Sequence, residues 1–235
     1  MEVQLGSIPV REALHFLGWR GTPVEPELMQ TLRTLCRETA AALEPRAILR
    51  RFPLRDGDFD GTGFRPRGRD ARALLATCRE GVLLAATLGA GSERMLLREQ
   101  ARGASRALLL DAVLSAGIEA VCDGIEARLR EECEAQGLFL TDRFSPGYGD
   151  MPLAQTREIC AVLSADKTIG LTVSQSGIMI PRKSVTAIMG VSRAPVSRRP
   201  SGCAACSMRG RCALSKEQRP SDAAGRQDTA ERTDS

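Results

Sequence analysis

The sequence is poor in several residue types on which common functions depend. Its 235 residues include one histidine, one tryptophan, one tyrosine and six phenylalanines. So few aromatic side chains offer little surface on which single-stranded nucleic acid could stack. The single histidine, His15, excludes a histidine-rich metal site. Its place in the apolar run Ala13-Leu14-His15-Phe16-Leu17 favours a half-buried structural role over a catalytic one.

Strong charge and long apolar runs are also missing. The chain has 33 Lys+Arg and 29 Asp+Glu, and its net charge of +4 comes entirely from residues 193–235. The neutral remainder has little electric field with which to hold a phosphate backbone. No apolar run reaches the roughly 18 residues of a membrane-spanning helix, and the first residues do not resemble a secretory signal. We therefore expect a cytoplasmic protein that binds neither nucleic acid nor a membrane.

The spacing of apolar residues predicts an α+β fold. Helical patterns cover residues 26–44, 70–79, 104–136 and 153–163, and strand-like runs cover 47–54, 81–89, 138–141, 169–173 and 185–191. Residues 56–68 are predicted to be a loop. This order favours a mostly antiparallel twisted sheet with long helices. We expect residues 1–192 to form one body and residues 193–235 to form a flexible, arginine-rich tail.

Two positions near the helices raise the question of ligand binding. The turn Gly89-Ala90-Gly91-Ser92 lacks the third glycine of a nucleotide-binding fingerprint, and Ser92 as a helix N-cap explains it equally well. Glu119 is the only ionisable acid between Ala112 and Cys122. A carboxylate in such an apolar stretch needs a partner, and a cationic ligand would serve, although the side chain could equally reach solvent on the far side of the helix.

The segment 143–152 is the strongest candidate for a binding loop. It reads Arg-Phe-Ser-Pro-Gly-Tyr-Gly-Asp-Met-Pro, and two prolines with two glycines predict a tightly turned, rigid loop. Arg143 can hold a carboxylate bidentately, and the phenol of Tyr148 can hydrogen-bond at a reacting centre. The alternative is an ordinary strand-to-helix connection with a buried tyrosine.

A second segment, residues 169–187, predicts a hairpin rich in hydroxyl groups. Ser174, Ser176, Ser184 and Thr186 lie close together in sequence, and Met179-x-Pro181 marks the corner. Hydroxyls on adjacent strands usually hydrogen-bond each other or solvent, so this pattern alone indicates no chemistry.

The tail carries a cysteine cluster, Cys203, Cys206 and Cys212, with the spacing C-x2-C-x5-C. Three nearby thiolates are a metal-site pattern, whereas the other five cysteines lie singly in helical patterns and behave as small hydrophobes. Zinc would need a fourth ligand, and an iron-sulfur cluster would suit electron delivery. Unliganded thiols are the remaining interpretation.

The two segments, in this order, resemble the activation domain of cobalamin (vitamin B12)-dependent methionine synthase. That family has an Arg-Pro-x-Pro-Gly-Tyr loop, a helix, and then a Thr-x-Ser-x-x-Met-x-Pro-x-x-Ser-Val-Ser segment. The residues that match are Arg143, Ser145, Pro146, Gly147 and Tyr148, then Ser174, Ser176, Met179, Pro181, Ser184, Val185 and Thr186. Residues 16–21, 86–89 and 143–150 are most similar to free-standing activation subunits, and the resemblance covers residues 14–192.

The resemblance implies an accessory subunit that binds S-adenosylmethionine and has no independent turnover. Its partner would be a methionine synthase, a methyltransferase, that lacks its own activation domain, and a reductase or other electron donor would take part. By position, Arg143 would hold the methionine carboxylate, and the backbone of Ser145, Pro146 and Gly147 would meet the adenosine. Tyr148 would face the corrin of the partner's cobalamin, and Glu119 would be a further ligand-binding residue.

A second hypothesis belongs to a different functional class. The cysteines at 203, 206 and 212 could hold zinc or an iron-sulfur cluster in an electron-transfer protein for another corrinoid protein, with no S-adenosylmethionine site in use. Substitution of Arg143 separates the two hypotheses, because only the first requires it. A structural partner with a degenerate pocket is the third interpretation.

Overall fold

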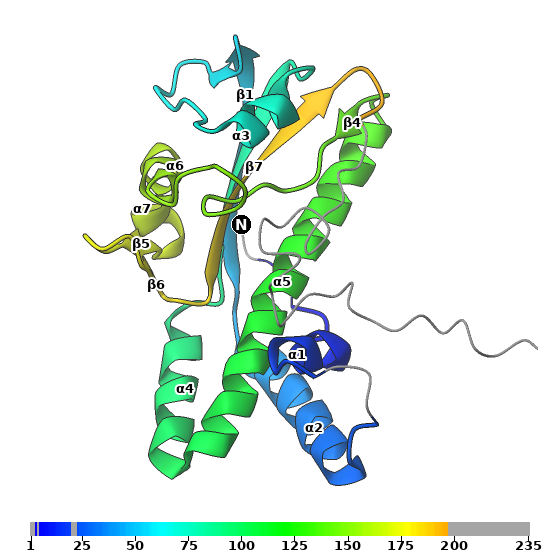
Figure 1. Cartoon of the computed structure of the whole chain (residues 1–235), viewed down its shortest axis with the longest axis vertical. Helices are drawn as coiled ribbons and strands as arrows, with labels where there is room; N and C mark the ends of the chain where they lie inside the picture. The colour runs from blue at the N-terminus through cyan, green and yellow to red at the C-terminus, as the bar shows by residue number, and fades with distance from the viewer. Residues whose placement is uncertain (1–2, 4, 20–22, 197–235) are drawn as a thin grey trace, which may run out of the picture.

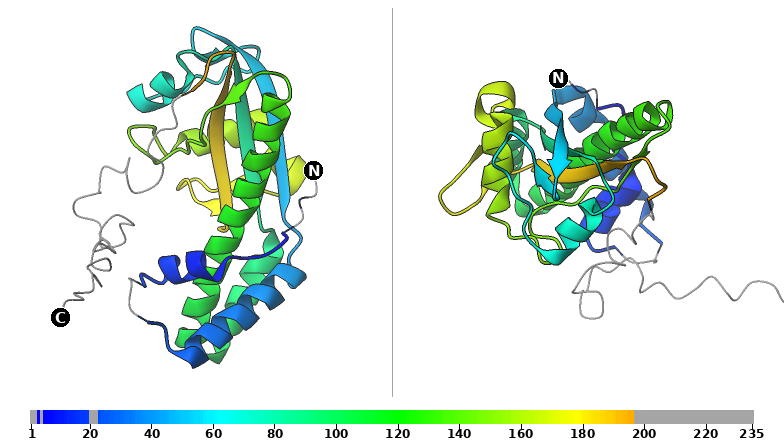
Figure 2. Two further views of the ribbon diagram at one scale, coloured as in Figure 1. Left: turned by 90° about the vertical axis from the view of Figure 1, so that its right-hand side faces the viewer. Right: turned by 90° about the horizontal axis from the view of Figure 1, so that it is seen from above.

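An antiparallel sheet with helices on both faces organises the chain (Figures 1 and 2). The computed structural model describes residues 3, 5–19 and 23–196. The sheet has the order β2-β1-β3-β7-β4. Its strands are β1 (Arg46–Arg55), β2 (Asp58–Phe59), β3 (Glu80–Thr87), β4 (Phe139–Leu140) and β7 (Ser184–Ser192). A separate two-stranded hairpin joins β5 (Thr172–Val173) to β6 (Met179–Ile180).

The central strand β3 divides the core into two layers. Val82, Leu84 and Ala86 pack into one apolar cluster, while Leu83 and Ala85 pack into another. This alternation follows from the two-residue period of a strand, and it explains why β3 is continuously apolar between its two end residues. The first cluster is covered by α5 (Ala104–Glu134), and the second by α3 (Arg69–Leu75), α6 (Gln155–Leu163) and α7 (Ala165–Ile169).

The long helix α5 runs along one face of the sheet and continues beyond it (Figures 1 and 2). Its buried residues include Leu110, Leu114, Ile118 and Val121, as the helical spacing predicts. The helix ends at Glu134, two residues before the predicted end, and the chain then turns at the predicted stop, Gly137, which has a φ of 69°. The amide of Leu138 then donates to the carbonyl of Cys133 at 2.9 Å, which closes the last turn.

Three helices gather around the N-terminal half of α5 (Figure 1). They are α1 (Val10–Phe16), α2 (Pro26–Ala42) and α4 (Ala90–Arg102). Val113 and Ala116 of α5 lie in an apolar cluster with Ala13 of α1 and Leu32 of α2. His15 is half-buried on α1, as the apolar pattern predicts.

Three sequence predictions need correction. Residues 56–68 contain β2, because Asp56 and Gly57, with φ values of 54° and 82°, form a tight turn that returns the chain to β1. The helix predicted to reach residue 79 ends at Leu75, since Glu80 already pairs with Pro53 in the sheet. The strand predicted over 169–173 is shortened to β5, because α7 extends to Ile169.

The predicted fold class is confirmed: the protein is α+β with a five-stranded antiparallel sheet. No helix in the described part of the chain combines the length and the apolar character that crossing a bilayer requires. The boundary at residue 192 and the character of residues 193–235 remain predictions.

Candidate functional site

The side chain of Arg143 lies against a row of carboxylates on α5. Its Nε donates to Glu126 Oε2 at 2.7 Å, and its Nη2 contacts Asp123 Oδ1 and lies 3.6 Å from Glu119 Oε2. The three acids share one face of the helix, because they are spaced four and three residues apart. Only 16% of the Arg143 side chain is exposed. The structure therefore brings two predicted ligand-binding residues, Arg143 and Glu119, together.

A second arginine extends this cluster to β4. Arg130 Nη2 lies 2.7 Å from Glu126 Oε1 and 3.5 Å from Asp142 Oδ1, and its Nη1 donates to the carbonyl of Leu140. Glu126 thus bridges Arg130 and Arg143. We name the six side chains the α5 carboxylate cluster: Glu119, Asp123, Glu126, Arg130, Asp142 and Arg143. Four carboxylates against two guanidiniums leave it with an excess of negative charge.

The pKa values around Arg143 reflect this charge. Burial would lower the pKa of the Arg143 guanidinium, but the hydrogen bond with Glu126 and the nearby carboxylates of Glu119 and Asp123 raise it above its usual value. Burial raises the pKa of the Cys122 thiol to about 12, although the Arg143 charge acts in the opposite direction. Arg143 is therefore always a cation, and Cys122 beneath it stays a neutral thiol at physiological pH.

The predicted loop is tightly turned and closed by its own backbone. The Gly147 amide donates to the Met151 carbonyl at 2.9 Å, and the Tyr148 amide donates to the Ser145 carbonyl at 3.1 Å. Gly147 has a φ of 92°, which only glycine adopts easily. Pro146 is buried and Ser145 is half-buried. Tyr148 is 55% exposed, so the alternative of a buried tyrosine is wrong.

The far end of the loop is held by Asp150, which the sequence analysis did not single out. Its Oδ2 accepts from the Arg69 amide at 2.7 Å, and its Oδ1 accepts from the Asp70 amide at 3.1 Å. These are the first residues of α3. The hydrogen bond from the Arg69 amide, followed by that from Asp70, lowers the pKa of Asp150 below its ordinary value. The loop is therefore fixed at Arg143 to α5 and at Asp150 to α3.

The hydroxyls of the second segment bond to one another, as expected. Ser174 Oγ and Ser176 Oγ lie 2.8 Å apart, and Ser184 Oγ donates to Thr87 Oγ1 at 2.8 Å. Arg157 of α6 contacts the carbonyl of Ser174. Arg157 thus joins the β5-β6 hairpin to α6, and Ser184 joins the start of β7 to the end of β3, which are structural roles.

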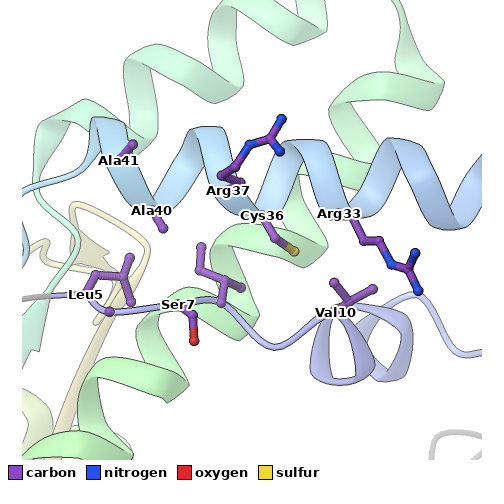
Figure 3. Close-up of a pocket in the computed structure, with 10 residues that line it drawn as sticks. Leu5, Ser7, Val10, Arg33, Cys36, Arg37, Ala40 and Ala41 are labelled. Carbon is purple, nitrogen blue, oxygen red and sulfur yellow. The ribbon is translucent and has the colours of Figure 1, made fainter.

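Two cavities lie elsewhere in the protein. One, of about 400 Å³, separates residues 5–10 from α2, where Cys36 and Arg37 line it (Figure 3). Burial raises the pKa of Cys36 to about 11, so that thiol is no nucleophile at neutral pH. The other, of about 480 Å³, lies beside Gly89 and Arg94. Neither Arg143 nor Tyr148 lines either cavity.

The turn at the start of α4 differs from its prediction. The helix begins at Ala90, so Gly89 occupies the N-cap position and the prediction for Ser92 is wrong. Ser92 lies within the first turn instead, and its Oγ donates to the Gly89 carbonyl at 2.7 Å. Gly89 has a φ of 77°. With this residue as the N-cap, α4 begins closer to β3 than an N-cap at Ser92 would place it.

The predicted metal ligands Cys203, Cys206 and Cys212 lie outside the described residues. Within residues 3, 5–19 and 23–196, no group of three or more His, Cys, Asp or Glu side chains is arranged to hold a metal ion. The five cysteines in this part of the chain are all free thiols, and four of them are buried. Their apolar surroundings agree with their interpretation as small hydrophobes.

No protein-family model and no curated protein matches the sequence. Among solved structures, a crystal structure of the MetH reactivation domain bound to AdoHcy is similar, with a TM-score of 0.60 and 16% sequence identity. The match covers 85% of this chain and 79% of that chain. The chain has the fold of a MetH reactivation domain. At this identity the likeness establishes the fold alone, and the ligand belongs to the solved protein.

The cluster contains acids that sequence reasoning missed, namely Asp123, Glu126 and Asp142. A signal for two of them was present: Glu119, Asp123 and Glu126 repeat at helical spacing on a flank of α5. Their common partner, Arg143, could not be found in the same way, because it follows the helix and is brought back by β4.

Proposed function

We propose that the protein binds S-adenosylmethionine at the loop 143–148 and α5, and that it supports reductive methylation of cobalamin in a partner methionine synthase. The observation that carries this proposal is the fold, which is shared over 85% of the chain with a reactivation domain crystallised with AdoHcy. The loop that bears the resemblance to activation domains adds support, since it is rigid and displays its tyrosine.

The proposed contacts follow the geometry of the loop. Arg143 would bind the ligand's carboxylate and Glu119, 3.6 Å from it, would face the positively charged end of the ligand. The backbone of Ser145, Pro146 and Gly147 would meet the adenosine. Tyr148, which is 55% exposed, would face the corrin of the partner. The protein's contribution would be orientation of the methyl group.

The carboxylate cluster adds a condition to this proposal. Arg143 already has protein partners, so a ligand carboxylate must replace one of them. Asp123 is the partner that can leave most easily, because 69% of its side chain is exposed against 18% for Glu126. Glu126 would keep the guanidinium oriented through Nε while Nη2 turns to the ligand. We therefore expect Asp123 to compete with the ligand.

The overall reaction needs an external electron. One electron from a donor and the methyl group of S-adenosylmethionine would convert cob(II)alamin of the partner to methylcobalamin. The methyl–sulfur bond breaks, its electron pair stays on sulfur, and S-adenosylhomocysteine is released. The electron would come from a reductase or another electron donor, as the resemblance implies.

Calorimetric titration with S-adenosylmethionine tests the binding step. We expect saturable binding by the wild type and at least a tenfold loss of affinity in Arg143→Lys, because lysine keeps the charge but cannot form the bidentate contact. Arg55→Ala removes a surface pair with Asp60 and serves as the control, which should bind normally. Absence of binding to the wild type, or equal binding by Arg143→Lys, would contradict the proposal.

A reactivation assay tests the partner and separates the alternative function. A methionine synthase without its activation domain, inactivated as cob(II)alamin, should regain activity with this protein, S-adenosylmethionine and a chemical reductant. Cys206→Ser should retain this activity. If Cys206→Ser abolishes reactivation while Arg143→Lys does not, the electron-transfer hypothesis drawn from the C-x2-C-x5-C spacing is favoured instead.

A further inference from the structure

The loop 143–150 and the turn before α3 fit together through two glycines. A Cβ on Gly68 would lie 2.5 Å from Asp150 Oδ1 and 2.8 Å from its carbonyl oxygen. A Cβ on Gly149 would collide with Oδ2 of Asp70. Each segment therefore places an aspartate against the other segment's glycine. Both glycines have positive φ values, 99° and 52°, so any side chain there is disfavoured by conformation as well as by space.

Asp150 makes this contact specific. Its two carboxylate oxygens accept separate backbone amides, from Arg69 and Asp70, and Arg69 Nε lies 3.6 Å away. The low pKa of Asp150 keeps these oxygens charged at neutral pH. Hydrogen bonds to a charged acceptor are stronger than those between neutral groups.

Tyr148 lies between the two fixed ends of the loop. Its amide donates to Ser145, and its carbonyl accepts from Met151 at 3.1 Å, so its backbone is fixed relative to the rest of the loop. Asp150 follows only two residues later. Arg143 holds the beginning of the loop to α5, but nothing in its contacts determines where the residues after Gly147 point.

We propose that Asp150 is a positioning residue for Tyr148, which it holds in place by binding the loop to the start of α3. This inference rests on the proposed function where it gives Tyr148 a role toward the corrin. The placement of Tyr148 by Asp150 is independent of the proposed function. Asp150 acts through the loop backbone and needs no contact with a ligand. The sites then divide between the two ends: Arg143 sets the affinity for S-adenosylmethionine, and Asp150 sets the efficiency of the step on the partner.

The single tyrosine gives a direct test of placement. With 3-fluorotyrosine incorporated, the protein yields one ¹⁹F resonance, whose shift is compared with that of the urea-unfolded chain. We expect Asp150→Ala to move the resonance at least halfway toward the unfolded value. Asp150→Asn, which keeps one acceptor oxygen, should give a smaller change. Asp60→Ala is the control, since Asp60 has a similar exposed fraction, 43% against 37%, and pairs with Arg55 in the β1-β2 region, away from the loop.

The functional arm measures two quantities on the same variants. Reactivation of the partner synthase should fall about ten- to a hundredfold in Asp150→Ala, because a displaced group loses its orientation. Affinity for S-adenosylmethionine should stay within about twofold of the wild type. Circular dichroism and the melting temperature check that each variant is folded. If Asp150→Ala does not fold, the graded change in Asp150→Asn decides.

The outcomes separate this inference from the proposed function. Wild-type ¹⁹F shifts in folded Asp150→Ala and Asp150→Asn would overturn the positioning role. A full loss of S-adenosylmethionine affinity in Asp150→Ala would also overturn it, because Asp150 would then act on the ligand site. If the wild type neither binds S-adenosylmethionine nor reactivates a synthase, the proposed function fails, and the ¹⁹F result alone still decides whether Asp150 places Tyr148.

Discussion

The ion-pair clusters near the two ends of α5 have the same arrangement but opposite net charge. At the α4-α5 turn, Glu99 binds Arg102 at 2.8 Å and Arg106 at 2.7 Å. Toward the other end, Glu126 binds Arg130 and Arg143, each at 2.7 Å. Both glutamates are largely buried, with 12% and 18% of their side chains exposed. In each case one carboxylate bridges two arginines.

The two clusters differ in the number of acids around the bridging glutamate. Two guanidiniums share a single carboxylate at Glu99, whereas Glu119, Asp123 and Asp142 add three further acids at Glu126. The first arrangement only fastens two helices together. The second has more acid than its arginines neutralise, and it lies beside the loop that carries the resemblance to activation domains. One helix thus takes part in a structural ion-pair cluster, that of Glu99, at one end and in a charged candidate site at the other.

Removal of the arginines should give the largest contrast between the two ends. Arg143→Ala leaves three carboxylates without their shared cation in a partly buried place, and we expect it to lower the free energy of unfolding by about 2–3 kcal/mol. Arg106→Ala should cost less, because 55% of that side chain is exposed. Urea denaturation of both variants measures the difference. Equal losses would show that the excess acid has no energetic consequence.

Neutralisation of the bridging acid should have the next largest effect. Glu126→Gln keeps the shape but weakens two charge-assisted hydrogen bonds, and we expect a loss of about 1–2 kcal/mol in the free energy of unfolding. Affinity for S-adenosylmethionine should also fall, since the single amide oxygen of glutamine cannot accept from both Arg130 and Arg143 and so orients Arg143 less firmly. Denaturation and calorimetry on one preparation check both effects. Unchanged affinity would mean that Glu126 does not orient Arg143.

The contribution of the Glu99 ion pairs to stability should depend on pH. The hydrogen bond with Arg106, together with Arg102, lowers the pKa of Glu99 in the folded protein. Its stabilising contribution is therefore complete above the unfolded-state pKa of about 4.3 and is lost as pH falls through the folded value. The stability difference between wild type and Glu99→Gln should shrink below about pH 4. The exposed Glu134, changed to Gln, is the control, and a difference independent of pH would refute the assignment.

The smallest effect on stability is expected at Asp123. Because 69% of its side chain is exposed, Asp123→Asn should change the free energy of unfolding by less than about 0.5 kcal/mol. If Asp123 competes with the ligand for Arg143, the same variant should bind S-adenosylmethionine more tightly than the wild type. Calorimetry decides, and weaker binding would mean that Asp123 assists the ligand instead of competing with it.

Most of the fold could be predicted because its elements have strong local periods. The apolar spacing along α5 and the continuous apolar run of β3 identify the central helix and strand without any knowledge of their partners. Boundaries were less predictable. α7 ends at Ile169, the residue at which the predicted strand begins, since Ser164, with a φ of 50°, lets a second short helix follow α6 directly.

Only part of the candidate site could be predicted, because some of its residues carry a local signal and others are defined by contacts between distant segments. Arg143, Tyr148 and the rigid loop have local signals in their residue types. The partners that fix them, Glu126 and Asp150 with the amides of α3, depend on contacts between distant segments. Glu119 is an intermediate case: an acid in an apolar stretch predicts either a cationic partner or access to solvent, and in the structure it pairs with Arg143 while 40% of its side chain is exposed.

The crossed packing of Gly68 and Gly149 has a consequence for how this protein can change. Each glycine accommodates an aspartate that belongs to the other's segment, so a methyl group at either position would push apart both α3 and the tyrosine loop. A saturation mutagenesis library should therefore find these two sites among the least tolerant in the molecule. We therefore expect both positions to remain glycine while the rest of the sequence changes.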